Sequence, residues 1–452
     1  MTQMNNDITQ ETAMPPELFY RNFGMPPLFT LEGTEHAAHD IFALPLQQHA
    51  LEIDDDAMAV FLRLGFFLSA DTPFKQIRVQ QPAAQEAFLR QQVQPYQGSF
   101  DDAAREYGEV FKRAIANYLS TMTQDKIVMP LSGGRDSRHM LFAILASGKQ
   151  IDHCVTCVRP PPYDEQDINV ARELCNELNI RHHALALEPD YLAQQLENFR
   201  MSGYCAEENA WISVVANYFN TLDSSYVAFD GLAGGILSDG AFTSAKKIQL
   251  YREEKWQELA DIILSAEGYL PAMLSKQDYL RWSREKAVSR VIAELKRYKH
   301  CPNPIGQFYL WNRTRREICY IPFGYMNKVV NVATPYMFRD VYNFLLQLPG
   351  KFFASESFHT RAIELTYPQY AHIRWAERTP PRPVGLAQRI KTLTNIGGFL
   401  LKNPHPVSKR FIYPRLAAGM LSGDYASRVT DIMATPVYLA ELQRFIRSGR
   451  RS

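Results

Sequence analysis

The stretch VMPLSGGRDSRHML contains a short group of residues whose types and spacing suit the binding of an anion. Gly133 and Gly134 let main-chain N–H groups approach an anion without a Cβ in the way, and a following helix adds its positive end. The hydroxyls of Ser132 and Ser137 can donate hydrogen bonds to phosphate oxygens. Asp136 would repel a polyphosphate unless it binds Mg²⁺, which prefers carboxylate and phosphate oxygens. These residues therefore indicate a site for phosphate and magnesium.

The glycine pair differs from two common nucleotide loops. No Lys-Ser/Thr follows a four-residue spacer, as a Walker A loop requires, and the pattern is not G-x-G-x-x-G. A purely structural Gly-Gly turn between a strand and a helix is the alternative interpretation.

The elements around the loop predict an α/β fold. Strands and helices alternate from residue 126 to residue 229, which indicates a parallel sheet with helices on both faces. The expected strands are Lys126–Leu131, Ile151–Val158, His183–Leu187 and Tyr226–Phe229. The expected helices are Asp101–Met122, Ser137–Ser147, Asp164–Leu178, Pro189–Met201 and Glu208–Leu222. From about residue 250 the pattern is helical, and we expect no further strand.

The loop resembles the pyrophosphate loop of the N-type ATP pyrophosphatases, within which the chain is similar to the asparagine synthetase family and its relatives, the β-lactam synthetases and lasso-peptide cyclases. VTCVRPPPYDEQDINVARELC resembles the family's second strand and the helix that follows it. FDGLAGGILSDG resembles its second glycine-rich loop, and VATPYMFRDVYNFLLQLP its Pro-Phe-Leu-Asp segment. The resemblance covers roughly residues 55–375 and implies an adenine nucleotide alpha-hydrolase-like sheet, a helical second half and a small N-terminal α+β domain.

The resemblance implies a reaction that uses ATP and Mg²⁺. ATP adenylates a substrate carboxylate and releases pyrophosphate, and ammonia or an amine then attacks the acyl-adenylate to give an amide and AMP. The carboxylate could belong to a small molecule, a peptide or a sugar acid. The chain could also form a homodimer, or receive its nitrogen from a partner protein.

The resemblance also assigns residues to roles. It places the pyrophosphate and Mg²⁺ on the loop from Ser132 to Ser137, with Asp136 as a catalytic residue and metal ligand. It places adenosine against Leu131, Val155 and Thr156, and it lines the same cleft with Asp230 and Gly231. Arg361 matches the family's helix arginine best. Three arginines in WNRTRREICY could face phosphate or a carboxylate, or form the basic face of an amphipathic helix: Arg313, Arg315 and Arg316, the last taken as catalytic.

The chain departs from the family's pattern at two places. The second Mg²⁺-binding Asp of the family should fall near Gly235, so Asp230 or Asp239 could supply a shifted ligand. The alternatives are metal binding through Asp136 alone or lost activity. The glutamine-dependent members carry Cys after the initiator Met, whereas this chain has Thr2 and only about 100 residues before the loop domain. We therefore expect no glutaminase activity. A catalytically degenerate nucleotide-binding protein is the second hypothesis for function.

The pair Cys154 and Cys157 raises a third hypothesis, a tRNA-thiolating enzyme that uses a pyrophosphate loop. The spacing of three within a strand puts the two side chains on opposite faces, which favours packing. His182 and His183 lack metal-ligand spacing to any cysteine, and packing or exposure is favoured for both. His139 follows the loop, where it could approach a phosphate, orient the loop or face solvent.

The bulk composition limits the remaining classes. The chain has 452 residues, and we divide it into a reduced glutaminase-like domain (1–97) with a disordered start, the synthetase-like domain (98–376) and a basic C-terminal extension (377–452). A net charge of +1 does not favour a nucleic-acid partner, although the segment 378–415 is basic and could be a solvated tail, a subdomain or a docking surface. No stretch suits a signal peptide or a membrane span, and few cysteines suggest reduced thiols in a cytoplasm.

Overall fold

The computed structural model describes residues 23–46, 50–163, 165–188, 190–208, 210–328, 330–354, 357–377 and 379–449. Residues 1–22, Thr2 included, and Asp164, Pro189 and Arg378 lie outside them. Phe23 and Met25 are buried, so the expectation of a poorly ordered start is wrong for residues 23–30.

A five-stranded parallel sheet forms the centre of the loop domain, in the strand order β6-β5-β4-β7-β8. Its strands are β4 (Lys126–Pro130), β5 (His153–Val158), β6 (Arg181–Ala186), β7 (Tyr226–Phe229) and β8 (Asn331–Ala333). The predicted parallel sheet is confirmed. The expectation that no strand follows residue 250 is wrong, because β8 pairs with β7 in register Val227 to Asn331.

Helices cover both faces of this sheet. Ile127 and Met129 of β4 join one hydrophobic cluster with Leu141 and Leu174, whereas Val128 joins a second cluster. The first cluster involves α5 (Arg135–Ala146) and α6 (Gln166–Glu177), and the second involves α8 (Ser213–Phe219) and η6 (Ile321–Met326). Burial on both faces explains why β4 reads as a continuous apolar run.

The N-terminal region has its own small antiparallel sheet, in the order β2-β1-β3. Its elements are β1 (Phe29–Leu31), β2 (Ala37–Ala38), η1 (Ile41–Ala43), α2 (Asp55–Leu64), β3 (Ile77–Val79) and α3 (Ala83–Arg90). The long helix α4 (Phe100–Thr121) then leads to β4. Ser99 caps α4, since its hydroxyl accepts the N–H of Asp102 at 3.2 Å, a contact worth about 1 kcal/mol.

The second half is mostly helical, as predicted. Its elements after β7 and up to residue 370 are α9 (Gly234–Leu237), α10 (Ala245–Arg252), α11 (Trp256–Leu264), α12 (Leu270–Met273), α13 (Lys276–Arg281), α14 (Arg284–Leu295), η4 (Lys296–Tyr298), α15 (Pro304–Tyr309), the π-helix η5 (Leu310–Ile318), η7 (Pro335–Met337), α16 (Arg339–Gln347), η8 (Gly350–Phe353), α17 (Phe358–Thr366) and η9 (Pro368–Tyr370). Within the described part of the chain, none of the helices combines the length and the apolar character that crossing a membrane requires.

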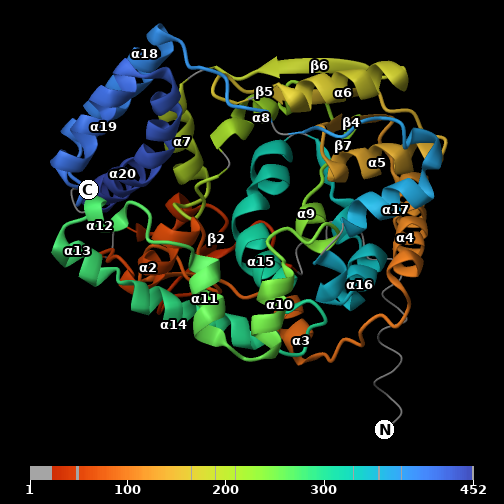
Figure 1. Ribbon diagram of the computed structural model, residues 1–452, viewed down its shortest axis with the longest axis horizontal. Coiled ribbons are helices and arrows are strands. Elements are labelled where there is room, and N and C mark those ends of the chain that lie inside the picture. Colours follow the sequence, from red (N-terminus) through yellow and green to blue (C-terminus); the bar gives the residue numbers. More distant parts are fainter. Residues whose placement is uncertain are drawn as a thin grey trace.

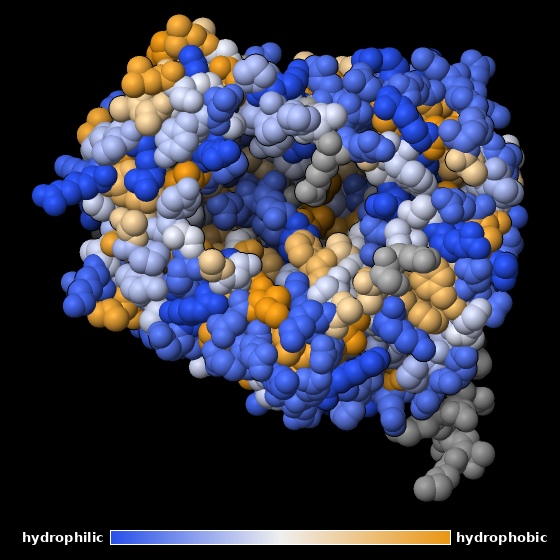
Figure 2. All heavy atoms as spheres, viewed as in Figure 1, coloured by the Kyte–Doolittle hydropathy of each residue, from blue (hydrophilic) through white to orange (hydrophobic). Residues whose placement is uncertain are grey.

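The C-terminal helices pack together and against α7 (Tyr191–Met201), on the side of the molecule away from α4 and α5 (Figure 1). They are α18 (Leu386–Lys402), α19 (Lys409–Leu421) and α20 (Gly423–Gly449). The side chain of Arg200 on α7 pairs with Glu441 on α20 at 3.0 Å. Figure 2, which has the same view as Figure 1, shows a hollow near the centre of the molecule. It lies in the region where Figure 1 places α8 and α15.

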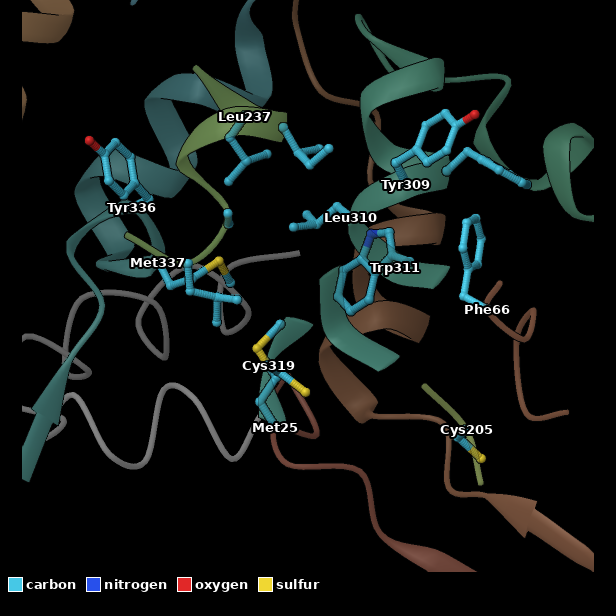
Figure 3. Close-up of a cluster of buried hydrophobic side chains, with 14 of the residues drawn as sticks. Met25, Phe66, Cys205, Leu237, Tyr309, Leu310, Trp311, Cys319, Tyr336 and Met337 are labelled. Atoms are coloured by element: carbon cyan, nitrogen blue, oxygen red, sulfur yellow. The ribbon is translucent and has the colours of Figure 1, made fainter. Parts of the chain in front are cut away.

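One hydrophobic cluster joins the N-terminal region to the second half of the chain (Figure 3). Trp311 and Leu310 of η5 lie in the same cluster as Met25 and Phe66 from the N-terminal region and Leu237 of α9. Burying each such side chain stabilises the fold by about 1.5–3 kcal/mol. The cluster fixes η5 and α9, the two elements that border the hollow opposite the sheet.

Candidate functional site

The candidate site lies at the carboxyl ends of β4 and β7. The chain runs from β4 to β5 and β6 on one side and then places β7 and β8 on the other, so the loops after β4 and β7 diverge. Such a switch point is where open parallel sheets bind ligands. A cavity of about 520 Å³ opens there, within the size range of small-molecule sites. Its walls include Leu131, Ser132, Asp136, Ser137, Val155, Thr156, Cys157, Arg159, Asp167, Glu208, Trp211, Asp230, Gly231, Gly235 and Arg313.

The N–H groups of Ser132, Gly133 and Gly134 in the first glycine-rich loop have acceptors inside the protein. Ser132 N–H donates to Ser137 Oγ at 3.2 Å, and Gly134 N–H donates to Ser132 Oγ at 3.1 Å. Gly133 N–H donates to Asp167 Oδ1 at 3.0 Å. Hydroxyls can rotate to donate to a ligand instead, but the Asp167 carboxylate can only accept. An anion that takes the Gly133 N–H must therefore displace Asp167.

The second glycine-rich loop closes around Asp136, and the first packs tightly against Ala376. A Cβ on Gly234 would lie 2.5 Å from Asp136 Cγ, and a Cβ on Gly133 would lie 2.2 Å from the Cβ of Ala376. Neither position can hold a side chain without movement of its neighbour. A Cβ on Gly235 would lie 3.7 Å from Asp136 Oδ2. The position where the resemblance expects a second carboxylate is thus directly beside Asp136.

A buried chain of polar side chains holds Asp136 from behind. Asp136 Oδ1 lies 3.3 Å from His359 Nδ1, and the other nitrogen of His359 lies 2.9 Å from His139 Nδ1. Tyr336 donates its hydroxyl to the main-chain oxygen of Asp136 at 2.8 Å. Burial keeps the pKa of His139 well below its usual range. His139 is fully buried, so it lies behind the loop and reaches neither a phosphate in the cleft nor solvent.

Two of the three predicted metal carboxylates face the cleft. Asp230 Oδ1 accepts the N–H of Leu232 at 2.9 Å, and burial, with the charge of Asp136 adding to it, raises the pKa of Asp230 to about 6. Asp239 is absent from the cleft lining, because Arg135 at 3.3 Å and Ser357 at 2.5 Å hold its carboxylate.

The donor set of the cleft fits Mg²⁺ only as part of a nucleotide complex. Among the described residues, no group of three or more His, Cys, Asp or Glu side chains could hold a metal alone. Mg²⁺ commonly takes one or two carboxylates together with phosphate oxygens and water. Asp136 and Asp230 supply such a pair, and the raised pKa of Asp230 shows that negative charge there lacks compensation.

Part of the cleft lining, next to the polar loop, is apolar. It contains the residues predicted to lie against adenosine. Leu131 and Val155 line it together with Trp211 and Ile212. Thr156 lines it too, and its hydroxyl donates to the main-chain oxygen of Leu131 at 2.6 Å. The strand ends thus place an apolar surface beside the polar loop.

The arginines predicted to be catalytic lie elsewhere. Arg316 is buried and donates to the main-chain oxygens of Ser69 and Asp71, and Arg361 pairs with Asp101 at 2.8 Å. Neither side chain is part of the cleft lining.

Arg313 is the arginine of that segment that lines the cleft, and it pairs with Glu208. The lining residues that sequence reasoning missed include Arg159, Asp167, Glu208 and Trp211. Arg159 could have been found, because it directly follows β5 and the ends of parallel strands meet at one edge.

The cysteine pair is structural. Cys154 belongs to the cluster on one face of the sheet and Cys157 packs on the other, which confirms the prediction of opposite faces. Hydrogen bonding with Cys175 and burial raise the pKa of Cys154, and burial raises that of Cys157 to about 11. Protonated thiols are poor nucleophiles, which disfavours thiolation chemistry. The Nε2 of His182 lies 2.8 Å from the hydroxyl of Thr156.

Comparisons with known proteins add little to this geometry. No family model matches the chain, and no curated protein matches it. The NMN synthetase from Francisella tularensis is among the solved structures that match, at 17% sequence identity and a TM-score of 0.23. The match covers 41% of this chain and 95% of that one. A likeness at this level carries no argument about function.

Proposed function

We propose that this chain is an ATP-dependent, AMP-forming ligase that joins a carboxylate to ammonia or an amine. The observation that carries the proposal is the position of the Ser-Gly-Gly-x-Asp-Ser loop. The loop opens a helix at the switch point of a parallel sheet, beside an apolar wall and a cavity of about 520 Å³. Helix N-termini with glycine-rich turns favour phosphate, and the apolar wall suits an adenine ring.

The residues of the cleft would divide the work as follows. Ser132, Ser137 and the loop N–H groups would hold the pyrophosphate part of ATP once Asp167 has moved from Gly133. Donors placed where charge develops on the leaving group stabilise the transition state more than the substrate. Asp136 and Asp230 would hold Mg²⁺, which when bound neutralises phosphate charge. Arg313 and Arg159 would face the α-phosphate or the substrate carboxylate across the cleft.

His359 would keep the Asp136 carboxylate pointing into the cleft. Its Nδ1 lies close to both Asp136 and Ser238, and Ser238 Oγ is 3.0 Å from that nitrogen. A carboxylate fixed by a buried neighbour loses less freedom when it meets a metal or substrate, which is a positioning contribution.

Pyrophosphate release tests the proposal. The full chain is incubated with ATP, Mg²⁺, ammonia and a panel of carboxylates that includes amino acids, peptides and sugar acids. We expect release of pyrophosphate and AMP that depends on one class of carboxylate. Asp136→Asn should lower the rate by about 100-fold or more. The exposed Asp125→Asn, which makes the same chemical change outside the cleft, should leave it unchanged.

A nucleotide-binding protein without turnover is the second candidate. Two observations favour it: Gly235 stands where a second carboxylate is expected, and the N–H groups of Ser132, Gly133 and Gly134 already have acceptors. Under this function ATP would bind, measured by calorimetry, while no carboxylate in the panel would cause pyrophosphate release. Nucleotide binding unchanged by Asp136→Asn would point the same way.

A further inference from the structure

A second, smaller cavity shares a wall with the cleft. It has a volume of about 110 Å³ and lies between the segment after β5, helix α7 and the C-terminal helices α18 and α20. Glu208 and Trp211 line both cavities. The remaining polar lining includes Tyr163, Tyr191, Gln194, Gln195, Gln388, Arg389, Thr392, Thr430 and Asp431. This volume is below the roughly 150 Å³ of a cavity that holds benzene, so only a very small organic molecule fits.

Two polar side chains in this lining, Gln195 and Arg389, have buried atoms with unmet hydrogen-bonding capacity. Gln195 is 8% exposed, and its Oε1 has no hydrogen-bond partner. The Nε of Arg389 is buried and also lacks a partner. No ion pair within the described ranges involves Arg389 or Asp431, although both line the same cavity. Buried polar groups are normally satisfied, so Gln195 Oε1 and Arg389 Nε each point to a missing partner. Asp431 is exposed and adds a negative charge to the same lining.

Arg382 shows what a satisfied arginine looks like in this region. It donates to the main-chain oxygens of Tyr163 and Arg159 and pairs with Glu165. Arg389, seven residues further along the chain, makes no such contacts within the described part of the protein. Arg389 and Asp431 thus carry opposite charges in the same lining without forming an ion pair with each other.

We propose that this second cavity binds a small molecule that carries a primary ammonium group and a carboxylate, and supplies its amine to the ligation. Asp431 pairs with the ammonium group, Arg389 pairs with the carboxylate, and Gln195 Oε1 accepts an N–H. A ligand with both charges satisfies all three groups at once.

The amine, and not the acyl group, is the part assigned here, and this step rests on the proposed function. The carboxylate to be adenylated must reach the α-phosphate inside the cleft. A nucleophile can wait beyond the wall formed by Glu208 and Trp211. Glu208 already pairs with Arg313, which leaves Asp431 as the carboxylate of this lining that can meet the ammonium group.

The chemistry of this step balances without a further reactant. The ammonium loses one proton to solvent, and its nitrogen then forms a bond to the acyl carbon. The bond from that carbon to the AMP oxygen breaks, AMP leaves with the electron pair, and the nitrogen loses a second proton to solvent. Nitrogen would thus enter as an amine carried by a small molecule and not as free ammonia.

Calorimetry with the full chain, without nucleotide, tests the site. The probes are the common α-amino acids, β-alanine and γ-aminobutyrate, each paired with the amine that lacks its carboxylate. At least one amino acid should bind the unmodified protein about tenfold more tightly than its matched amine. Asp431→Asn should weaken both members of that pair by about tenfold, whereas Arg389→Gln should weaken only the amino acid.

Matched controls make these variants informative. Asp424→Asn on the same helix and Arg410→Gln on α19 change the same charges outside the cavity and should leave binding intact. If no probe binds the unmodified chain, or if Asp431→Asn binds as well as the unmodified chain, the second site is overturned. Amino-acid binding without pyrophosphate release would support the site and count against the ligase; release with ammonia and no amino-acid binding would do the reverse.

Discussion

The two glycine-rich loops at the ends of β4 and β7 meet at the Asp136 carboxylate, but they differ in what they add to it. The first loop supplies Ser132, Ser137 and the N-terminus of α5, a helix of twelve residues. The second supplies Asp230 and the close main-chain approach of Gly234, and it has Gly235 where a carboxylate is expected. Under the proposed function the first loop would therefore carry the phosphate chemistry, while the second would chiefly shape the space around Asp136.

Because of this difference, substitutions in the two loops should have different effects. A change in the first loop alters the groups that meet an anion. A change in the second loop alters the position or the charge of Asp136 and leaves those groups in place. Variants that separate position from charge can therefore break or sharpen the comparison.

Gly234→Ala should have the largest effect, because it moves Asp136. The added Cβ would lie 2.5 Å from Asp136 Cγ, so the carboxylate must rotate out of place. We expect pyrophosphate release to fall by about 100-fold, since a displacement of about 1 Å can cost that much. Gly235→Ala, whose Cβ meets Asp136 Oδ2 at an ordinary 3.7 Å, is the matched control and should cost about twofold or less. Equal losses in both variants would show that the second loop does not position Asp136.

Asp230→Asn should change the dependence of stability on pH. The folded-state pKa of Asp230 is about 6, above its ordinary value of 3.8. Between these values the folded protein holds a proton that the unfolded chain has lost, so stability falls as pH rises through about 4 to 6. The penalty is complete above about pH 6, where it amounts to about 1–3 kcal/mol after allowance for solvent in the cleft.

Removing this carboxylate should therefore raise the free energy of unfolding at pH 7 and change it little near pH 4. Urea unfolding at both pH values measures the effect. Asp125→Asn, an exposed carboxylate, should show no such dependence. A variant that is equally stabilised at both pH values would mean that Asp230 is not held uncompensated beside Asp136.

Gly235→Asp should convert the second loop into a metal-binding loop. The new carboxylate would begin beside Asp136 Oδ2, so Mg²⁺ would gain a ligand and bind about tenfold more tightly in the presence of ATP. Without metal, the added like charge should lower stability by about 1 kcal/mol. Titration of ATP binding with Mg²⁺ tests the first effect and urea unfolding the second, with Gly235→Asn as the uncharged control. A loss of Mg²⁺ dependence would contradict the placement of the metal between the two loops.

The sequence could predict the parallel sheet and the loop at its switch point, because both rest on local patterns. Lys126–Pro130 is a buried apolar run, and the glycine pair follows it directly. The strand β8 could not be predicted, since its three residues in an apolar, proline-containing stretch carry no periodicity of their own. It becomes a strand only because β7 offers an open edge.

The roles of the arginines could not be predicted for a different reason. Arg313, Arg315 and Arg316 lie on a π-helix, whose wider turn changes which residues share a face. Arg316, predicted to be catalytic alongside the resemblance, instead ties η5 to the N-terminal region, and nothing in the sequence singles out Arg313. Likewise, no local pattern links Gly133 to Asp167, which lies 34 residues away and meets it only through the sheet.

Asp167 gives the smallest predicted effect and the most direct test of the first loop. Its Oδ1 accepts the N–H of Gly133, so it occupies one donor that a phosphate would use. Asp167→Asn keeps an oxygen that can accept but removes the charge that repels phosphate. We expect ATP and pyrophosphate to bind about three- to tenfold more tightly, measured by calorimetry at constant salt.

Glu177→Gln, at the other end of α6, removes an exposed carboxylate and is the matched control. It should leave nucleotide binding unchanged, because its partner is His372 at the surface. If both variants bound nucleotide more tightly, the change in the protein's net charge would explain the effect, and not the contact with Gly133. Weaker binding in Asp167→Asn alone would mean that the Asp167 carboxylate helps the loop to hold its ligand. If Asp167 only occupied the Gly133 N–H, removing its charge would make it easier for the anion to displace it.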